Sequence, residues 1–552
     1  MVTVGKIGFA VVPGWATEDN VPRVDFSTKT QRVRRVVPGR VRMGVDVKDA
    51  EKVPLKEEST SSSATQGSTV EPSLTQPAAE YRPSMLCELV EGLQETVEDV
   101  SLHLQRKYFT KKTDLINKKR KKLVILGSGW ASHAMIKVVD NFKWDVQVVS
   151  PKNYFLFTPM LPSSSVGTVE FRSIVEPIRA SNELVEYVEA KCLRIDPTRK
   201  MLICASGDEN LKVDDDTETF EISYDQLVVA VGARTGTFGV EGAEQYCYFL
   251  KGIDDARRLR RAIVDTFEKA NLDIYSEEEK RKLLTFVVVG GGPTGCEFAA
   301  ELRDFLRNDL ARFYPLLINL VGVKLLQSGD SILTQFDASL REQALENFRK
   351  SGIDVITNTR VIRVTKDRIY LRDGTEIPSG VCVWAAGNAP TNFARNLVKD
   401  VPEQASQKSG RILVDDYLRV VGLKDVFAIG DCSEVVSGSL PASAQVAAQQ
   451  GAYLARLLNK YELDEEPPKM RSGNSARPFR FLSLGILAYI GSDQALVEID
   501  LPGQQHLDLA GRLAFLLWRS VYLTKQVSTR NRVLVLADWL KTQFFGRDIS
   551  QF

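Results

Sequence analysis

The sequence predicts an α/β protein with two Rossmann-like dinucleotide-binding domains and a C-terminal amphipathic region. Apolar strands alternate with helices after Lys121, two glycine fingerprints each lie between a strand and a helix, and an aromatic segment with basic flanks lies near the C terminus. Such alternation is typical of parallel sheets. Because the 552 residues exceed the size of one hydrophobic core, several domains are expected. Strands are expected at 123–126, 145–149, 226–231, 284–289, 319–326 and 380–385.

Composition excludes several classes of protein. Hydrophobic residues make up 43% of the chain and charged residues 26%, and the net charge of +1 gives no reason to expect nucleic acid binding. The chain has only three histidines, His103, His133 and His506. They are too few and too dispersed for a metal site or a Ser-His-Asp hydrolase. The cysteines, none at C-x-x-C spacing, are Cys87, Cys192, Cys204, Cys247, Cys296, Cys382 and Cys432. We therefore expect no metal, and chemistry supplied by bound cofactors.

The N-terminal region differs in composition from the rest of the chain. Residues 1–84 are expected to be a disordered extension, because a basic stretch at 31–44 precedes Ser, Thr, Pro and Gly residues at 57–80 that cannot build a core. A mitochondrial presequence is poor in acidic residues, whereas this extension contains Glu18, Asp19 and Asp25. Targeting and a simple solvated extension therefore both stay open. Residues 85–120 fit an amphipathic helical lead-in.

The first glycine fingerprint follows the strand at 123–126. Gly127 permits a tight turn, and Gly129 lets the backbone approach a pyrophosphate at the N terminus of a helix expected over 130–139. At the third position, where Gly or Ala is usual, the chain has Ser132. The next strand ends at Ser150 instead of an acidic residue, and a hydroxyl can still reach a ribose as a neutral partner.

The second fingerprint is more complete. Gly290, Gly292 and Gly295 follow three valines and open a helix that contains Glu297. The next strand ends at Gln327, where an NADH-selective site carries a carboxylate that repels the 2′-phosphate of NADPH. A neutral amide predicts relaxed choice between NADH and NADPH.

Two dinucleotide sites in one chain imply electron transfer between them, because a nicotinamide carries hydride and a flavin can accept it. The segment DVFAIGDC at 425–432 supports a flavin, since it places Gly430 and Asp431 after an apolar strand. An Asp there can bond the ribityl chain, and a following helix N terminus can face the pyrophosphate. The alternative is an ordinary cap by Asp431 at a strand-to-helix junction.

Longer stretches resemble the type II NADH dehydrogenases, the single-subunit alternative NADH:ubiquinone oxidoreductases among the flavoprotein reductases with two dinucleotide domains. The resemblance covers about residues 121–552. It is carried by LGSGWA (126–131), VVSPKNYFLFTPMLPSSSVGTVEFRSIVEPIR (148–179), VVVGGGPTGCEFAAEL (287–302), FAIGDC (427–432), AQVAAQ (444–449), LAYIGSDQA (487–495), FLLWRS (515–520) and RNRVLVLADWLKTQFFGRDIS (530–550).

The resemblance implies three binding sites. FAD is expected at Gly127, Gly129, Trp130, Ser150, Asn153, Tyr154, Thr158, Pro159, Gly430 and Asp431. NADH or NADPH is expected at Gly290, Gly292, Gly295, Gln327, Ala386 and Gly387, with Glu297 as the catalytic residue near the nicotinamide. The quinone is expected at Gln445 and Gln449, which share one helix face and whose amide donors suit its two carbonyl acceptors. Without the resemblance, this pair would be interpreted as helix surface.

The expected domain boundaries are set by these motifs. After the extension and the lead-in come the first part of the FAD domain (121–283), the NAD(P)H domain (284–378), the second part of the FAD domain with the quinone motif (379–470) and the membrane-association region (471–552).

The C-terminal region offers an interfacial helix. At helical spacing, one apolar face is formed by Val533, Leu536, Leu540 and Phe544, with Trp539 and Phe545 at its edges. The flanking basic residues are Arg530, Arg532, Lys541 and Arg547. No apolar run reaches the roughly 18 to 20 residues of a spanning helix, so peripheral attachment is expected. Packing of this helix on a protein core or a dimer partner stays open.

The resemblance implies an enzyme that passes hydride from NAD(P)H to FAD and then electrons to ubiquinone, without pumping protons. It also implies a peripheral homodimer at the mitochondrial inner membrane. One alternative is a disulfide reductase, which needs a cysteine pair beside the flavin, and neither Cys296 nor Cys432 has a close sequence partner. The other is an NAD(P)H-binding flavoprotein that acts as a sensor or interaction module without turnover.

Overall fold

The computed structural model describes residues 97–102, 104–106, 108–115, 118–207, 217–461, 468–469, 475–501 and 505–550. The predicted extension at 1–84 and the first part of the lead-in lie outside these ranges. Residues 97–102, which belong to the expected lead-in, are helical. Nearby, the buried Arg106 donates to the carbonyl oxygens of Ile136 and Lys137.

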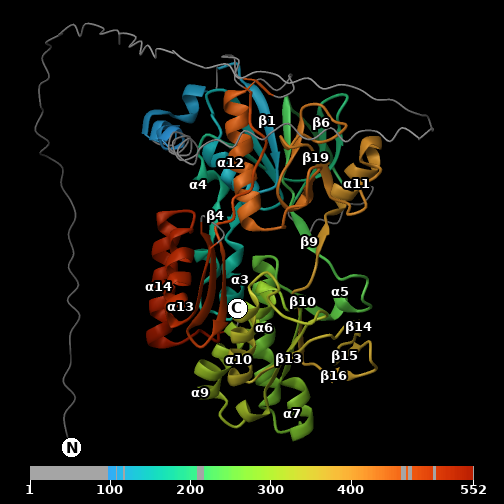
Figure 1. Cartoon of the computed structure of the whole chain (residues 1–552), viewed down its shortest axis with the longest axis vertical. Helices are drawn as coiled ribbons and strands as arrows, with labels where there is room; N and C mark the ends of the chain where they lie inside the picture. Colours follow the sequence, from blue (N-terminus) through green and yellow to red (C-terminus); the bar gives the residue numbers. More distant parts are fainter. Residues whose placement is uncertain are drawn as a thin grey trace, which may run out of the picture. The chain divides into compact units, whose positions relative to one another are not determined.

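The first sheet has seven strands in the order β20-β8-β1-β2-β5-β6-β7 (Figure 1). The first five run parallel, and β6 and β7 are added antiparallel. Their bounds are β1 (Lys121–Leu126), β2 (Trp144–Ser150), β5 (Glu186–Asp196), β6 (Met201–Ser206), β7 (Thr219–Ser223), β8 (Gln226–Val229) and β20 (Val426–Ala428). The central strands are continuous apolar runs because helices such as α2 (Trp130–Val138) and α12 (Ala444–Lys460) cover the sheet.

The second sheet is parallel, with the order β10-β17-β11-β12-β13. Its strands are β10 (Cys247–Phe249), β11 (Thr285–Val289), β12 (Gly322–Leu326), β13 (Ile353–Ile356) and β17 (Val381–Trp384), and its main helices are α6 (Ile253–Ala270), α8 (Pro293–Phe305) and α10 (Ala338–Ser351). A small antiparallel sheet joins β14 (Val361–Val364), β15 (Arg368–Leu371) and β16 (Glu376–Pro378). Every strand expected from the sequence is present, and the expected parallel sheets are confirmed.

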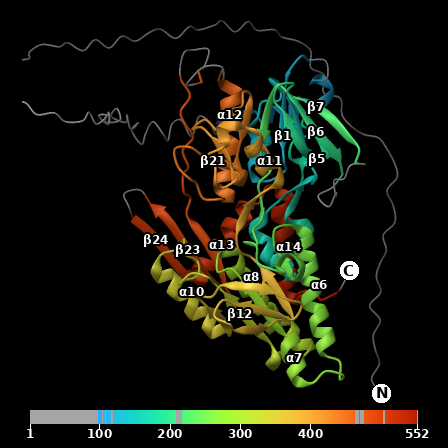
Figure 2. The same cartoon turned by 90° about the vertical axis from the view of Figure 1, so that its right-hand side faces the viewer.

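The C-terminal part forms an antiparallel sheet and two helices (Figure 2). The strands are β22 (Ile486–Gly491), β23 (Gln494–Leu501) and β24 (Gln505–Gly511), and the helices are α13 (Arg512–Thr524) and α14 (Thr529–Phe545). β22 packs against α8 of the second domain, and α13 packs against β23. Across the described ranges, no helix combines the length and the apolar character needed to cross a membrane.

The remaining elements connect these layers. The short strands are β3 (Tyr154–Leu156), β4 (Val175–Pro177), β9 (Ala233–Thr235), β18 (Asn388–Pro390), β19 (Ile412–Val414) and β21 (Ser433–Val435). The short helices are α3 (Leu161–Ser165), α4 (Ile178–Ser181), α5 (Ala243–Tyr246), α7 (Glu277–Leu283), α9 (Ala311–Phe313) and α11 (Asn392–Asp400). Because β9 pairs with β18, the chain leaves and re-enters the first domain along adjacent strands.

Candidate functional site

The first glycine loop connects β1 to α2 at the carboxyl edge of the first sheet. Gly127 has φ +105°, and a Cβ there would lie 2.3 Å from the carbonyl oxygen of Ala230, so only glycine fits. Gly129 precedes the first turn of α2, and a Cβ there would meet no atom within 4 Å. Open space at a helix N terminus is the environment in which a pyrophosphate binds.

The two serines that replace usual residues of this motif are both buried. The Ser150 hydroxyl donates to Ser128 Oγ at 3.1 Å and accepts from the Lys152 amide at 3.2 Å. Ser132 lies inside α2, where the close approach is made by another helix: a Cβ on Gly451 of α12 would lie 2.1 Å from the carbonyl oxygen of Ala131. A serine is therefore tolerated at the third position.

Other residues expected to bind FAD gather near this loop. Trp130 Nε1 donates to Thr158 Oγ1 at 3.0 Å, which joins α2 to the turn that contains Pro159. Asn153 and Tyr154 lie just before that turn, in and beside β3. Since β20 runs parallel to β8 and β8 to β1, Gly430 and Asp431 follow their strand at the same sheet edge as Gly127, and a cavity of about 300 Å³ includes Asp431 in its lining.

The second glycine loop repeats this geometry at the carboxyl edge of the second sheet. Gly290 has φ +116°, and a Cβ there would lie 2.9 Å from the carbonyl carbon of Ala385, just before Ala386 and Gly387. At Gly292 a Cβ would meet nothing within 4 Å, whereas at Gly295 it would lie 2.0 Å from the carbonyl oxygen of Gly290. Only the middle glycine therefore faces open space.

Gln327 ends β12 beside this loop. Its Oε1 accepts from the Gly291 amide at 3.0 Å, and its Nε2 donates to the Ser331 carbonyl at 3.2 Å. The side chain therefore supports the loop and brings no charge to the place where a ribose would bind.

Glu297 lies in α8 and is 6% exposed. Its Oε1 accepts from the Tyr489 amide at 3.2 Å, and the aromatic rings of Tyr489, Trp518 and Tyr522 pack together alongside β22. Burial raises the pKa of Glu297 to about 8, and the nearby Glu301 carboxylate adds to the shift. The carboxyl group is therefore mostly protonated at neutral pH and can donate a hydrogen bond.

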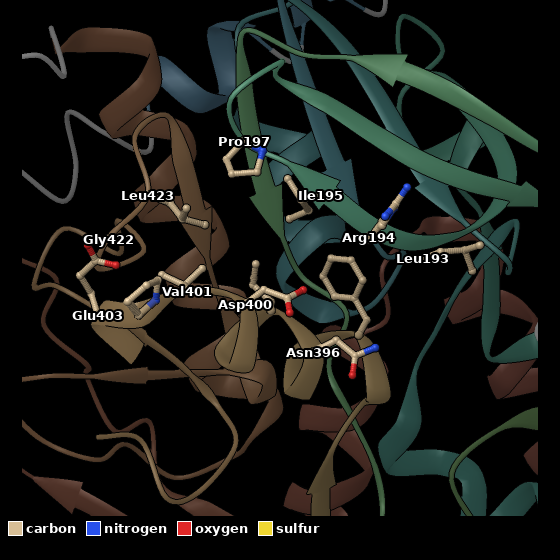
Figure 3. Close-up of a pocket in the computed structure, with 13 residues that line it drawn as sticks. Leu193, Arg194, Ile195, Pro197, Asn396, Asp400, Val401, Glu403, Gly422 and Leu423 are labelled. Atoms are coloured by element: carbon tan, nitrogen blue, oxygen red, sulfur yellow. The ribbon is translucent and has the colours of Figure 1, made fainter. Parts of the chain in front are cut away.

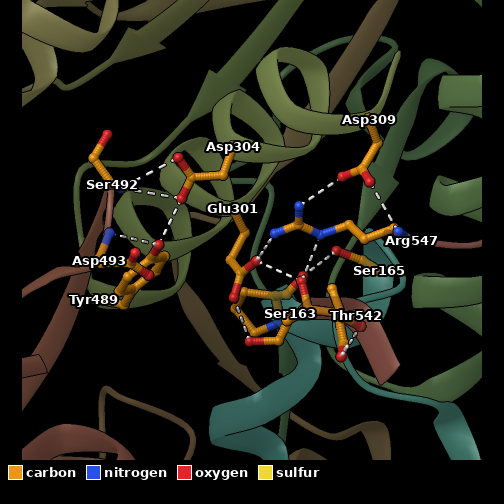
Figure 4. Close-up of polar contacts among 12 residues, drawn as sticks. Ser163, Ser165, Glu301, Asp304, Asp309, Tyr489, Ser492, Asp493, Thr542 and Arg547 are labelled. Carbon is orange, nitrogen blue, oxygen red and sulfur yellow. Dashed lines mark hydrogen bonds and ion pairs between the residues drawn. The ribbon is translucent and has the colours of Figure 1, made fainter. Parts of the chain in front are cut away.

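Further along α8, Glu301 and Asp304 belong to a buried polar network (Figure 4). Glu301 accepts from Ser163 and Thr168, each at 2.7 Å. Asp304 accepts from the Tyr489 hydroxyl at 2.6 Å, and burial raises the pKa of Asp304 to about 6. Sequence reasoning did not assign this network, although the spacing of the three acidic residues places them on one helix face.

Arg547 closes this network and corrects an expectation. The sequence placed Arg547 at the basic flank of an interfacial helix, but its side chain is 9% exposed and lies 2.8 Å from Asp309 and 3.3 Å from Glu301 (Figure 4). α14 ends at Phe545, so the chain turns inward after the helix and the guanidinium reaches the buried carboxylates. A buried charge requires such partners.

Gln445 and Gln449 lie one turn apart on α12, as expected, and both amides contact the segment 482–485. Gln445 accepts from the Leu484 amide and donates to the Gly485 carbonyl, at 3.1 and 2.8 Å. Gln449 accepts from and donates to the backbone of Leu482, at 3.0 and 2.8 Å. One N–H of each amide is left for another acceptor.

The C-terminal helices present an apolar surface. The exposed apolar residues on α13 and α14 are Leu513, Leu516, Val533, Leu536, Leu540, Phe544 and Phe545. Trp539, expected at the edge of this face, is instead buried with Val535 on the opposite side of α14. The guanidinium of Arg519 lies 4.9 Å from the Trp539 ring centroid. α14 therefore packs on the core with one side and exposes apolar residues on the other.

The cysteines bear on the disulfide reductase alternative. Cys296 and Cys432 are buried and donate to the carbonyl oxygens of Gly291 and Val229, each at 3.4 Å. A pair distant in sequence does exist: Cys247 Sγ and Cys382 Sγ lie 3.2 Å apart on β10 and β17. This pair belongs to the second sheet and not to the first glycine loop.

One further cavity, of about 310 Å³, lies between the β5–β6 hairpin and α11 (Figure 3). Apolar residues such as Ile195 and Leu423 line it together with Arg194, Asp400 and Glu403. None of the residues expected to bind a cofactor or quinone belongs to its lining.

Comparisons with known proteins agree with this organisation. Residues 121–451 match the family model described as pyridine nucleotide-disulphide oxidoreductase, and residues 484–548 match the NDH2 C-terminal domain. A probable NADH dehydrogenase of Dictyostelium discoideum is 42% identical, over 78% of this chain and 91% of that protein. The mitochondrial external alternative NAD(P)H-ubiquinone oxidoreductase B1 of Solanum tuberosum is 39% identical, over 78% and 91%. The structure of NDH2 from Plasmodium falciparum in complex with NADH has a TM-score of 0.71 at 28% identity, over 78% and 100%.

Proposed function

The chain belongs to the type II NADH dehydrogenases, and we propose that its two glycine loops bind FAD and NAD(P)H, respectively. It is a single-subunit NAD(P)H:quinone oxidoreductase of mitochondria, and we propose ubiquinone as its quinone, because relatives are named NAD(P)H-ubiquinone oxidoreductases. The observation that carries the site assignment is the repeated loop geometry. In each loop a glycine with positive φ makes the turn and the next motif glycine faces open space at a helix N terminus.

The residues of the first loop fit FAD. Gly129 leaves room for the pyrophosphate, Asp431 lines a cavity and would bond the ribityl chain, and the bond between Trp130 and Thr158 orders the neighbouring wall. When bound, FAD takes up hydride from NAD(P)H and delivers two electrons to the quinone.

The chain's own contribution is alignment, exclusion of water and control of one proton. Gly290, Gly292 and Gly295 shape the loop for NAD(P)H, and Gln327 holds that loop without a charge that would repel a 2′-phosphate. Glu297 holds its proton at neutral pH inside an aromatic pocket. A neutral carboxyl there can orient a carbonyl or amide group without placing an uncompensated charge in the interior.

The proposed quinone site involves α12 and the segment 482–485, and the proposed membrane surface is formed by α13 and α14. Gln445 and Gln449 support the segment 482–485, in which Leu482 is 66% exposed and Leu484 is 48% exposed. Together with the exposed apolar residues of α13 and α14, these leucines suit an entry for an apolar quinone at a lipid surface. The expected homodimer stays a prediction, which sedimentation velocity checks.

NADH consumption with a soluble short-chain ubiquinone tests the enzymatic function against the sensor. Continuous turnover is expected, and a protein that binds NADH without turnover would be the sensor. Replacing Gln445 and Gln449 by Leu is expected to raise the KM for quinone while flavin reduction by NADH continues at its normal rate. An unchanged quinone KM would remove both glutamines from the site.

The membrane surface needs point substitutions, because deletion of residues 525–552 would also remove Val535 and Trp539 from the core. Phe544→Asp with Phe545→Asp, at positions 77% and 82% exposed, is expected to release the protein from anionic vesicles in a sedimentation assay. Leu316→Asp, at a position 87% exposed in the NAD(P)H domain, is the matched control and should leave binding intact. Equal vesicle binding by all variants would place the attachment surface elsewhere.

A further inference from the structure

Two cysteines that are far apart in sequence face each other in the NAD(P)H domain. Cys247 in β10 is the register partner of Cys382 in the neighbouring parallel strand β17, so their side chains share one face of the sheet. Their sulfur atoms lie 3.2 Å apart. A disulfide has an S–S length of about 2.05 Å, so closure requires an approach of about 1 Å.

The two thiols lie in or beside an apolar cluster and differ in their exposure to solvent. Cys382 is 4% exposed within a small apolar cluster that includes Val287 and Trp384, and Cys247 packs at its margin and is partly exposed. The hydrogen bond with Cys247 raises the pKa of the Cys382 thiol, and burial adds to this shift. Because Cys247 is partly exposed and Cys382 is buried, an oxidant from solvent meets Cys247 first. The Cys382 sulfur, 3.2 Å away, is then the neighbouring group that can attack the oxidised Cys247.

The position of the pair connects it to the nucleotide loop. β17 continues into Ala385, whose backbone a Cβ on Gly290 would contact, and Trp384 Nε1 donates to the Ala386 carbonyl at 3.0 Å. β10 is an edge strand of only three residues, and Lys251 just after it donates to Asn388 Oδ1 at 3.2 Å. Both strands therefore lead into the segment that borders the second glycine loop.

We propose that Cys247 and Cys382 are an oxidative modification site, at which hydrogen peroxide converts the dithiol into a disulfide that weakens NAD(P)H binding. The Cys247 thiolate attacks one oxygen of hydrogen peroxide, the O–O bond breaks, and the other oxygen leaves as hydroxide, so that Cys247 becomes a sulfenic acid. The Cys382 thiol then attacks the Cys247 sulfur, and the S–O bond breaks with release of water. In sum, two thiols and one hydrogen peroxide give one disulfide and two waters, with two electrons passing from the sulfurs to the peroxide.

The effect on binding rests on the proposed function, and its cause is mechanical. Drawing β10 toward β17 by about 1 Å moves the residues beside Gly290, and misplacement on that scale costs up to about 100-fold in turnover. We expect the KM for NADH to rise about tenfold on oxidation, with retention of FAD and reversal by dithiothreitol.

The test treats the purified FAD-loaded protein with hydrogen peroxide, blocks remaining thiols in denaturant and maps peptides by mass spectrometry. A cross-linked peptide joining Cys247 to Cys382 is expected, and dithiothreitol should remove it. The variant with Cys192→Ser and Cys204→Ser, which removes another pair of strand partners, should keep the cross-link. Free or over-oxidised Cys247 without a cross-link overturns the proposal.

The kinetic arm uses Cys247→Ala, which leaves the buried Cys382 in place. Its KM for NADH should not respond to peroxide, whereas that of the wild type should rise and recover with reductant. A cross-link that forms with no change in KM overturns the effect on binding. Absence of NADH:quinone activity in the reduced wild type would instead count against the proposed function, while the peptide map would still decide whether the dithiol reacts.

Discussion

The two glycine loops have the same backbone turn but achieve close packing differently. Both begin with a glycine of positive φ and both leave open space at the next motif glycine. In the second loop Gly295 allows α8 to lie against the carbonyl of Gly290. In the first loop that position is Ser132, and the close approach is made by Gly451 of α12, which contacts the backbone of Ala131.

This difference shows that a missing motif glycine is not a missing site. The space that glycine provides is needed where two backbones approach, and in the first domain that place lies between α2 and α12, far along the chain. The residues at the ends of β2 and β12 also contact their glycine loops differently. Ser150, at the end of β2, donates to the Ser128 hydroxyl, whereas Gln327, just after β12, accepts from the Gly291 amide. Four substitutions test how far the equivalence holds.

Gly451→Ala should have the largest effect. Its Cβ would lie 2.1 Å from the Ala131 carbonyl oxygen, so α12 must move away from α2, and overpacking of this kind costs about 1–3 kcal/mol or more. We expect loss of FAD on purification and with it loss of all activity, measured by bound flavin per chain. Ala452→Gly, at the neighbouring helix position, is the control and should keep its flavin. A yellow, active Gly451→Ala protein would contradict the role given to this contact.

Gly295→Ala should break the second loop alone. The added Cβ would lie 2.0 Å from the Gly290 carbonyl oxygen, and we expect kcat/KM for NADH to fall about 100-fold with FAD still bound. Stopped-flow bleaching of the flavin by NADH measures this. Ser132→Gly in the first loop is the counterpart, for which near-normal flavin content and NADH kinetics are expected. Equal loss in both variants would mean that the third position has the same role in each loop.

Glu297→Gln removes the ionisable group from a buried carboxyl position that the first domain lacks, because α2 has Ala134 at the corresponding position. Burial raises the pKa of Glu297 from 4.5 to about 8, so the contribution of this group to the stability of the wild type is fully present below pH 4.5 and is lost as pH rises toward 8. Gln cannot ionise. The wild type should therefore lose Tm relative to Glu297→Gln between pH 5 and 8, as about 1.4 kcal/mol accompanies each pKa unit. Parallel Tm curves would refute the shift.

Gln327→Glu should have the smallest effect. The carboxylate keeps an acceptor for the Gly291 amide, 3.0 Å away in the wild type, and adds a charge that repels a 2′-phosphate. We expect kcat/KM for NADPH to fall about tenfold, which corresponds to about 1.4 kcal/mol, with little change for NADH. Gln327→Leu removes the acceptor without adding charge and should weaken both nucleotides alike. Equal effects of Gln327→Glu on the two nucleotides would refute this role of the side chain.

Local patterns predicted the parts of the fold that local forces determine. The strands and both glycine turns were predicted because apolar runs and positive-φ glycines leave a signal within about ten residues. The exposed apolar face of α14 was predicted from helical spacing, and Leu540 and Phe544 are indeed exposed. Such patterns therefore suffice for elements and for the faces of single helices.

The rest of the site depends on partners that are distant in sequence. Trp539 and Arg547 were placed on the surface because their partners come from other elements: the partly buried Arg519 for Trp539, and the buried Glu301 and Asp309 for Arg547. The spacing of Gln445 and Gln449 was visible, but the segment 482–485 that they hold gave no local sign. The periodicity of one segment carries no information about the partner residues that a distant segment places against it.

The visible absorption of the purified protein during anaerobic addition of NADH and then a soluble ubiquinone tests both glycine loops at once. We expect a flavin spectrum that NADH bleaches and that quinone restores. A protein that stays colourless after reconstitution with FAD, or whose flavin NADH cannot bleach, would contradict the central claim that the two loops hold a flavin and its reductant.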